Sequence, residues 1–167
     1  HYVSITAATS QTACAAGTYN PNTGSTSSSA CLDASAGHHV PSPGASNETA
    51  CSAGTYQPST GQSSCIDASA GYYVATVAST NQTACAVGTY QPNTGQPSCI
   101  DASLGHYVPT TGASNETACG LGTFQNMTGQ VSCTDASAGY YVNSTGAASQ
   151  TACLSGSYQP LTGQTGC

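Results

Sequence analysis

The sequence contains no Lys and no Arg, and only 4% of its 167 residues are charged. Binding to the phosphates of nucleic acids or of anionic lipids requires cations, so both are poor partners for this chain. A trypsin-like protease finds no cleavage site in it. No apolar run is long enough to cross a bilayer, and no signal peptide is recognisable. The sequence therefore predicts no nucleic-acid binding and no membrane insertion in this segment.

Large apolar side chains are also scarce. Ile, Leu, Val and Phe account for 17 of 167 residues and Trp is absent, which is well under the ~20% expected of a chain with a conventional core. Low hydrophobicity by itself would favour disorder, but disordered chains usually also carry a high net charge. Here 19 Gly, 10 Tyr and 10 Cys recur in fixed phase. We therefore expect a thin structure held by crosslinks instead of a core.

The cysteines follow a regular spacing. After the first pair, the gaps between them alternate between 20 and 14 residues, which gives a period of 34. A fixed period of this size indicates one small supersecondary unit stacked on copies of itself. The ten residues are Cys14, Cys31, Cys51, Cys65, Cys85, Cys99, Cys119, Cys133, Cys153 and Cys167.

The period divides the chain into five repeats, the last of them partial. Because the chain starts and ends in repeat phase without an initiator Met, we interpret it as part of a longer array or as a mature product. The copies begin at His1, His38, Tyr72, His106 and Tyr140, and span residues 1–37, 38–71, 72–105, 106–139 and 140–167.

Each repeat also splits into two related halves. In the third copy, one half runs from Gly71 to Cys85 and the other from Gly88 to Cys99, so the Gly-to-Cys gaps are 14 and 11. In the first copy the second half has three extra residues, and its gap is again 14. We interpret this insertion as restoring the longer half, which favours an ancient doubling of a Gly-x-Tyr…Cys module.

An even number of cysteines in a polar, repetitive chain favours disulfides and an oxidising, extracellular compartment. Structural zinc sites use more closely spaced ligands, so we expect no metal; His38 and His39 are adjacent, but the other repeats lack such a pair. Pairing across the longer gaps would strand Cys14 and Cys167 unless neighbouring chains supply partners. Pairing across the shorter gaps uses all ten thiols: 14–31, 51–65, 85–99, 119–133 and 153–167.

The shorter pairing is favoured by a turn signal inside each short loop. Pro92 can begin a type I turn and Gly95 can take the left-handed position that follows it. Such a hairpin brings its ends together, as a disulfide requires. On the chain-entropy model, a loop of this length contributes on the order of 3 kcal/mol.

One motif carries a resemblance to a known family. Cys-x-x-Gly-Thr-Tyr-x-Pro-x-Thr-Gly-Gln-x-x-Cys begins at Cys51 and Cys85 and, with Ser for its first Thr, at Cys153. It resembles the cysteine-rich repeats of ephrin-receptor-like and tumour-necrosis-factor-receptor-like ectodomains. The resemblance implies modules stacked into an elongated rod. Ala68 and Ser69 stand where those families have Cys-Pro, so half of their crosslinks are missing, and no ligand-binding residues carry over.

Sequons of the form Asn-x-Ser/Thr predict covalent glycans. The first three occupy the same phase, four residues before a cysteine, which would place glycans on one recurring loop; chance in a Thr-rich chain is the alternative. No other cofactor is expected. The five are Asn47, Asn81, Asn115, Asn126 and Asn143.

Two further recurring positions carry chemistry. One Asp per repeat follows the second cysteine by two residues, and it either bridges calcium or, as we favour, serves in a turn or cap: Asp33, Asp67, Asp101 and Asp135. His or Tyr opens each repeat and fits an aromatic stacking position. No combination of nucleophile, general base and general acid recurs among the repeats, so we expect that the chain is not an enzyme.

The sequence thus predicts an all-β, elongated linear array of short disulfide-stapled β-hairpin repeats with little hydrophobic core. The function that this favours is that of a structural extracellular repeat protein, the subunit of a secreted, glycosylated fibre, hair or surface filament whose partners are copies of itself. The alternative is the stalk or binding module of a cell-surface adhesin or receptor.

Overall fold

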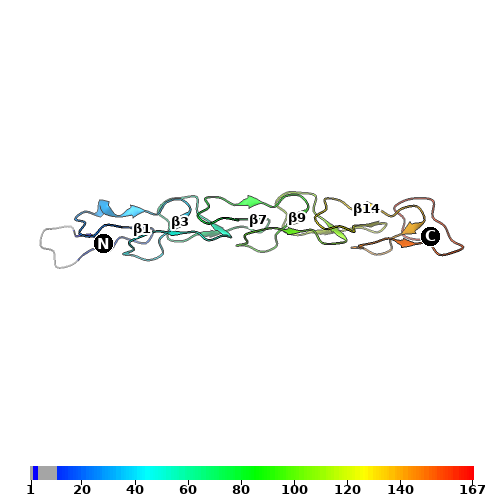
Figure 1. Ribbon diagram of the computed structural model, residues 1–167, viewed down its shortest axis with the longest axis horizontal. Helices are drawn as coiled ribbons and strands as arrows, with labels where there is room; N and C mark the ends of the chain where they lie inside the picture. The colour runs from blue at the N-terminus through cyan, green and yellow to red at the C-terminus, as the bar shows by residue number, and fades with distance from the viewer. Residues whose placement is uncertain (1, 4–10) are drawn as a thin grey trace. The chain divides into compact units, whose positions relative to one another are not determined.

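The computed structural model describes residues 2–3 and 11–167, and His1, where the first predicted repeat begins, lies outside them. Short strands recur from one end of this part of the chain to the other (Figure 1). The strands are β1 (Thr18–Tyr19), β2 (Leu32–Asp33), β3 (His38–His39), β4 (Thr49–Ala50), β5 (Thr55–Tyr56), β6 (Ile66–Asp67), β7 (Tyr72–Tyr73), β8 (Thr83–Ala84), β9 (Thr89–Tyr90), β10 (Ile100–Asp101), β11 (His106–Tyr107), β12 (Thr117–Ala118), β13 (Thr123–Phe124), β14 (Thr134–Asp135), β15 (Tyr140–Tyr141) and β16 (Thr151–Ala152). One 3₁₀ turn, η1, spans Ser28–Ala30.

Each strand pairs with its neighbour in sequence to form a two-stranded sheet, from β1–β2 to β15–β16. The pairing is antiparallel and in register, as in β5–β6, where Thr55 faces Asp67 and Tyr56 faces Ile66. Antiparallel partners can be joined by a direct connection without a crossover. Residues 57–65 connect β5 to β6 and include Pro58 and Gly61, which has φ 70°. Gly95, expected in the left-handed region, has φ 69°. The prediction of an all-β array of short hairpins is confirmed.

Each hairpin lies inside a segment that we call a half-module. A half-module begins at a glycine with positive φ and ends at a Cys or Ala whose N–H donates to that glycine's carbonyl, as Cys51 does to Gly37 and Ala68 to Gly54, both at 2.8 Å. The terminal Cys or Ala is buried except at Cys153, which is half-buried. The half-modules in the described part of the chain span residues 17–34, 37–51, 54–68, 71–85, 88–102, 105–119, 122–136 and 139–153.

The two halves of a repeat therefore have the same length, which corrects the interpretation from Gly-to-Cys gaps. Residue 54 to residue 68 spans the same 14 positions as residue 37 to residue 51, because the equivalent of Cys51 is Ala68 and not Cys65. The three extra residues of the first copy make half-module 17–34 longer than the others and do not restore an original length. That half-module is the one that contains η1.

The chain divides into two compact units, which we describe separately. The first contains the described residues up to Ser69, with Tyr73–Thr83 and Thr94–Ser98. The second contains Ala70–Tyr72, Ala84–Asn93 and Cys99–Cys167.

Within the first unit, backbone hydrogen bonds join consecutive half-modules. Gly37 N–H donates to the Gln57 carbonyl at 2.8 Å, and Val40 N–H donates to that of Gln62 at 3.0 Å. The next junction repeats the scheme, since Gly54 N–H donates to the Val74 carbonyl at 2.7 Å. Each junction therefore satisfies backbone groups that would otherwise have to face water.

The second unit uses the same donors and acceptors. Gly88 N–H donates to the Val108 carbonyl at 2.8 Å, and Gly105 N–H donates to that of Gln125 at the same distance. Gly122 donates to Val142 at 2.9 Å. The junction is thus a property of the half-module, repeated along the chain, and not of one particular pair.

Burial is confined to a few small side chains per repeat. In the second repeat these are Val40, Cys51, Gln57 and Ala68, each at most 4% exposed. The Gln57 amide is satisfied internally, because its Nε2 donates to the Ser64 carbonyl at 2.8 Å and its Oε1 accepts from Ser59 N–H at 3.1 Å. This narrow interior agrees with the predicted lack of a conventional hydrophobic core.

Replacement of Gly54 by Ala should destabilise the first unit strongly. A Cβ at Gly54 would clash with the Gly95 carbonyl, and the residue has φ +89°. The left-handed backbone alone costs about 1–2 kcal/mol for a residue with a side chain. Gly24, with φ +71° and open space around it, is the matched control. Thermal unfolding should show a larger loss for Gly54→Ala than for Gly24→Ala; equal losses would contradict the close-packed junction.

Candidate functional site

The disulfides tie successive half-modules together. Cys51 is the last residue of half-module 37–51, and Cys65 directly precedes β6 in the next half-module. The bond therefore encloses β5 and the turn that follows it, and fixes them to the preceding hairpin. The five bonds are Cys14–Cys31, Cys51–Cys65, Cys85–Cys99, Cys119–Cys133 and Cys153–Cys167, the pairs across the shorter gaps.

Alternate junctions lack a disulfide, and the equivalent positions explain why. Half-modules correspond at a spacing of 17 residues, so that Ala68 matches Cys51 and Gln82 matches Cys65. Ala68 is 0% exposed, as Cys51 is. Ala68 therefore stands where the resemblance expected a cysteine, and the residue that would be its partner is a polar side chain.

That polar side chain makes a hydrogen bond in place of the disulfide. In the first unit, Ser35 N–H donates to Glu48 Oε2 at 2.6 Å and Ser69 N–H donates to Gln82 Oε1 at 2.7 Å. In the second unit the corresponding distances are 2.6 Å from Ser103 to Glu116 and 2.6 Å from Ser137 to Gln150. We call these four contacts the polar staples. Disulfides and polar staples alternate along the array.

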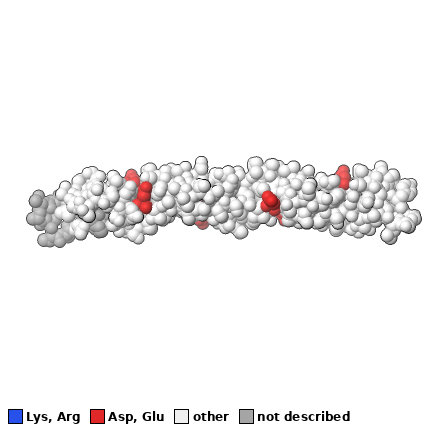
Figure 2. All heavy atoms as spheres, in the orientation of Figure 1, with Lys and Arg blue, Asp and Glu red and all other residues white. Residues whose placement is uncertain are grey.

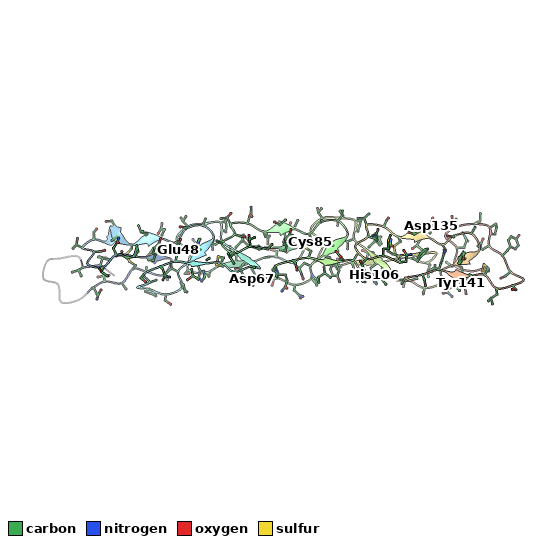
Figure 3. The ribbon with its side chains drawn as sticks, in the orientation of Figure 1. Glu48, Asp67, Cys85, His106, Asp135 and Tyr141 are labelled. Carbon is green, nitrogen blue, oxygen red and sulfur yellow. A yellow bond between two sulfur atoms is a disulfide. The ribbon has the colours of Figure 1, made fainter. Side chains whose placement is uncertain are left out.

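The polar staples are of two chemical kinds. Glu48 lies 3.9 Å from His38 and Glu116 lies 3.8 Å from His106, measured from carboxylate oxygen to Nδ1. The repeats that open with Tyr72 and Tyr140 carry Gln at the staple position instead. Within these four repeats, His therefore accompanies Glu, and Tyr accompanies Gln. Figure 3 labels Glu48 and His106, one member of each Glu–His pair.

Ser103, His106 and Glu116 form a three-residue cluster that resembles a hydrolase triad only in composition. Ser103 Oγ lies 3.1 Å from His106 Nδ1 and donates to Glu116 Oε1 at 2.8 Å. Glu116 approaches the same Nδ1. A catalytic relay needs the hydroxyl and the carboxylate on opposite ring nitrogens. The cluster lacks this arrangement, and its contacts connect Ser103 with Glu116.

The second repeat also brings His39 against its disulfide. His39 Nδ1 lies 3.2 Å from Cys65 Sγ, and the nearest ligand atoms of His39, Cys51 and Cys65 all lie within 4.8 Å of one another. Sequence reasoning considered His38 with His39 and did not connect either with a cysteine, since Cys65 is 26 residues away.

The four Asp residues lie in strands, which corrects their assignment to turns or caps. Asp67, for example, ends β6 and faces Thr55, and its carboxylate lies beside Gly95 of the next repeat. Asp33 and Asp135 occupy the same place in β2 and β14. Among the described residues, no carboxylate belongs to a group of three or more potential metal ligands.

The sequon asparagines, residues 47, 81, 115, 126 and 143, are all exposed. Asn47, Asn81 and Asn115 each precede the staple residue directly, so they recur at one place in the half-module. Figure 2 shows a surface on which isolated acidic groups interrupt uncharged side chains. In the part of the chain that the structure describes, no helix has the length and apolar character needed to cross a membrane.

Sequence reasoning missed the polar staples and the buried glutamines. The signal for both lies in the 17-residue correspondence, which aligns Glu48 with Cys65 and Val40 with Gln57. In the four repeats that begin at residues 38, 72, 106 and 140, the sequence also combines His with Glu and Tyr with Gln. Comparison of the Gly-to-Cys gaps did not reveal these correspondences, because it aligned Cys85 with Cys99 and not with Ala102.

Comparison with known proteins agrees with a chain of cysteine-rich repeats. The family described as tyrosine-protein kinase ephrin type A/B receptor-like matches residues 49–85 and 71–119. No curated protein matches the chain. Residues 49–119 thus match cysteine-rich repeats of the ephrin-receptor-like type, the family that the motifs resemble, and such repeats are consistent with an extracellular module.

Removal of one polar staple should destabilise its repeat by about 1 kcal/mol, the net value of an intramolecular hydrogen bond. We expect Glu48→Ala to lower the unfolding temperature, because the Ser35 N–H loses its acceptor. Glu48→Gln is the control, since Gln82 and Gln150 serve the same role. Thermal unfolding followed by circular dichroism tests this, and equal stability of Glu48→Ala and the wild type would contradict it.

Proposed function

We propose that this chain is a structural extracellular repeat protein and the subunit of a secreted, glycosylated fibre, hair or surface filament. The observation that carries the proposal is the repeated junction, in which the same glycine N–H donors and carbonyl acceptors join half-modules in both units. A half-module that can pack on its neighbour in the chain can pack in the same way on one from a second copy. Repetition of a head-to-tail contact produces a filament.

Composition supports a role outside the cell. The five disulfides are stable in an oxidising compartment. The absence of Lys and Arg removes trypsin-like cleavage sites. A junction made from backbone hydrogen bonds needs no large core. A non-catalytic, mechanical role fits these properties.

The proposed assembly can be tested on the oxidised wild-type protein. We expect it to form filaments at high concentration, visible by electron microscopy and as rapidly sedimenting species, because the backbone junction that joins half-modules within the chain can also join copies.

Gly24→Ala should assemble as the wild type does, since a Cβ at Gly24 would meet open space. Wild-type protein that forms only monomers at high concentration would overturn the filament proposal.

Glycosylation can be tested on the protein isolated from its natural source. We expect a mass above that of the bare chain, and conversion of Asn47, Asn81 and Asn115 to Asp after enzymatic release of N-glycans, because these exposed residues share one position. Peptide mass mapping after chymotryptic digestion locates the sites. A mass equal to that of the unmodified oxidised chain would contradict this part of the proposal.

A second candidate is the stalk or binding module of a cell-surface adhesin or receptor. The match of residues 49–119 to ephrin-receptor-like repeats favours it. The gene that encodes the chain separates the two. A membrane-spanning helix or a distinct globular domain attached to the repeats would favour the stalk, whereas many further repeats would favour the filament.

A further inference from the structure

His39 distinguishes the second repeat from the others. Its Nδ1 lies 3.2 Å from Cys65 Sγ, and Cys51 Sγ belongs to the same compact group of three potential ligands. The equivalent residues in the three following repeats are Tyr73, Tyr107 and Tyr141. Phenol groups in place of the imidazole leave those disulfides without a nitrogen ligand.

The group is accessible from one side. Cys65 is half-buried, whereas Cys51 is 0% exposed. An open cavity of about 480 Å³ adjoins them, lined by residues that include His39, Thr49, Ser52, Thr55 and Cys65. Small molecules and solvent can therefore reach the sulfur atom of Cys65 and the imidazole of His39 together.

We propose that the second repeat is a redox-dependent site for a thiophilic cation of the Zn²⁺ class, with Cys51, Cys65 and His39 as its ligands. Two equivalents of a thiol reductant supply two electrons that break the Cys51–Cys65 bond. The reductant becomes a disulfide, and the chain gains two thiols. Binding of Zn²⁺ then releases the two thiol protons, since thiolates are the ligands.

The geometry suits tetrahedral coordination. Zn–S and Zn–N distances of about 2.3 and 2.0 Å place neighbouring ligand atoms about 3.3–3.8 Å apart. The three ligand atoms already lie within 4.8 Å of one another, so the two sulfur atoms need only separate when their bond breaks. Water from the adjoining cavity can supply the fourth ligand. The closure of the hairpin loop is then maintained by the metal instead of the disulfide.

The test uses the five disulfides of the full chain as internal controls. The oxidised protein is equilibrated in a glutathione redox buffer, with and without Zn²⁺ at a buffered free concentration. Thiols are then trapped by alkylation and located by chymotryptic peptide mapping. We expect Zn²⁺ to raise the reduced fraction of Cys51–Cys65 severalfold and to leave Cys85–Cys99 unchanged.

Two variants tie the effect to the imidazole. His39→Tyr introduces the residue found at this position in the following repeats, so the fold should be retained, and the Zn²⁺ effect should disappear. Tyr107→His should transfer the effect to Cys119–Cys133. As a second readout, Co²⁺ added to the partly reduced wild-type protein should give thiolate-to-metal charge-transfer absorption that His39→Tyr lacks.

The outcomes are separable from those of the assembly experiment, because this site lies within one repeat and does not depend on filament formation. A Zn²⁺ effect that is equal at all five disulfides, or one that persists in His39→Tyr, would overturn the proposal. So would the absence of both the Zn²⁺ shift and the Co²⁺ absorption in the wild type.

Discussion

The close approach of backbone to backbone between half-modules is the constraint on which the rest of this structure depends. A Cβ at Gly17, Gly37 or Gly54 would clash with a carbonyl further along the chain. Only glycine permits this distance, and only this distance allows N–H and C=O groups of neighbouring half-modules to pair. Backbone hydrogen bonds thus take over much of the role that apolar packing has in larger domains.

Disulfides and polar staples stabilise half-modules that bury only a few side chains. A disulfide limits the unfolded ensemble, which matters most where few side chains are removed from water. This chain uses a disulfide at every second junction and a Ser N–H to Glu or Gln hydrogen bond at the others. Because of this alternation, equivalent positions of consecutive half-modules carry different residues. Cys51 and Cys65 form a disulfide, whereas the equivalent positions carry Ala68 and Gln82. The sequons stand beside the hydrogen-bonded junctions.

Variation within the repeats is informative because the framework is constant. In the four repeats that begin at residues 38, 72, 106 and 140, His is combined with Glu and Tyr with Gln, as in His38 with Glu48 and Tyr72 with Gln82, whereas the first repeat combines His1 with Gln11. His39 stands alone, since the equivalent position carries Tyr73 in the next repeat. His39 thus departs from the repeat pattern at a position that contacts a disulfide, and this departure is the basis of the metal site proposed for the second repeat.

The period, the all-β class, the cysteine phase and the lack of cationic side chains could be read from the amino-acid sequence, because they follow from composition and from turn residues such as Pro92 and Gly95. The sequence also identified Ala68 as the place of a missing cysteine. The correspondence between half-modules became visible from the folded chain, since the hydrogen bond of Ala68 to Gly54, and not the cysteine spacing, defines the length of a half-module. The tertiary structure likewise placed Asp67 in a strand and His39 against Cys65. Contacts between residues far apart in sequence depend on how the hairpins stack, and local pattern does not contain that information.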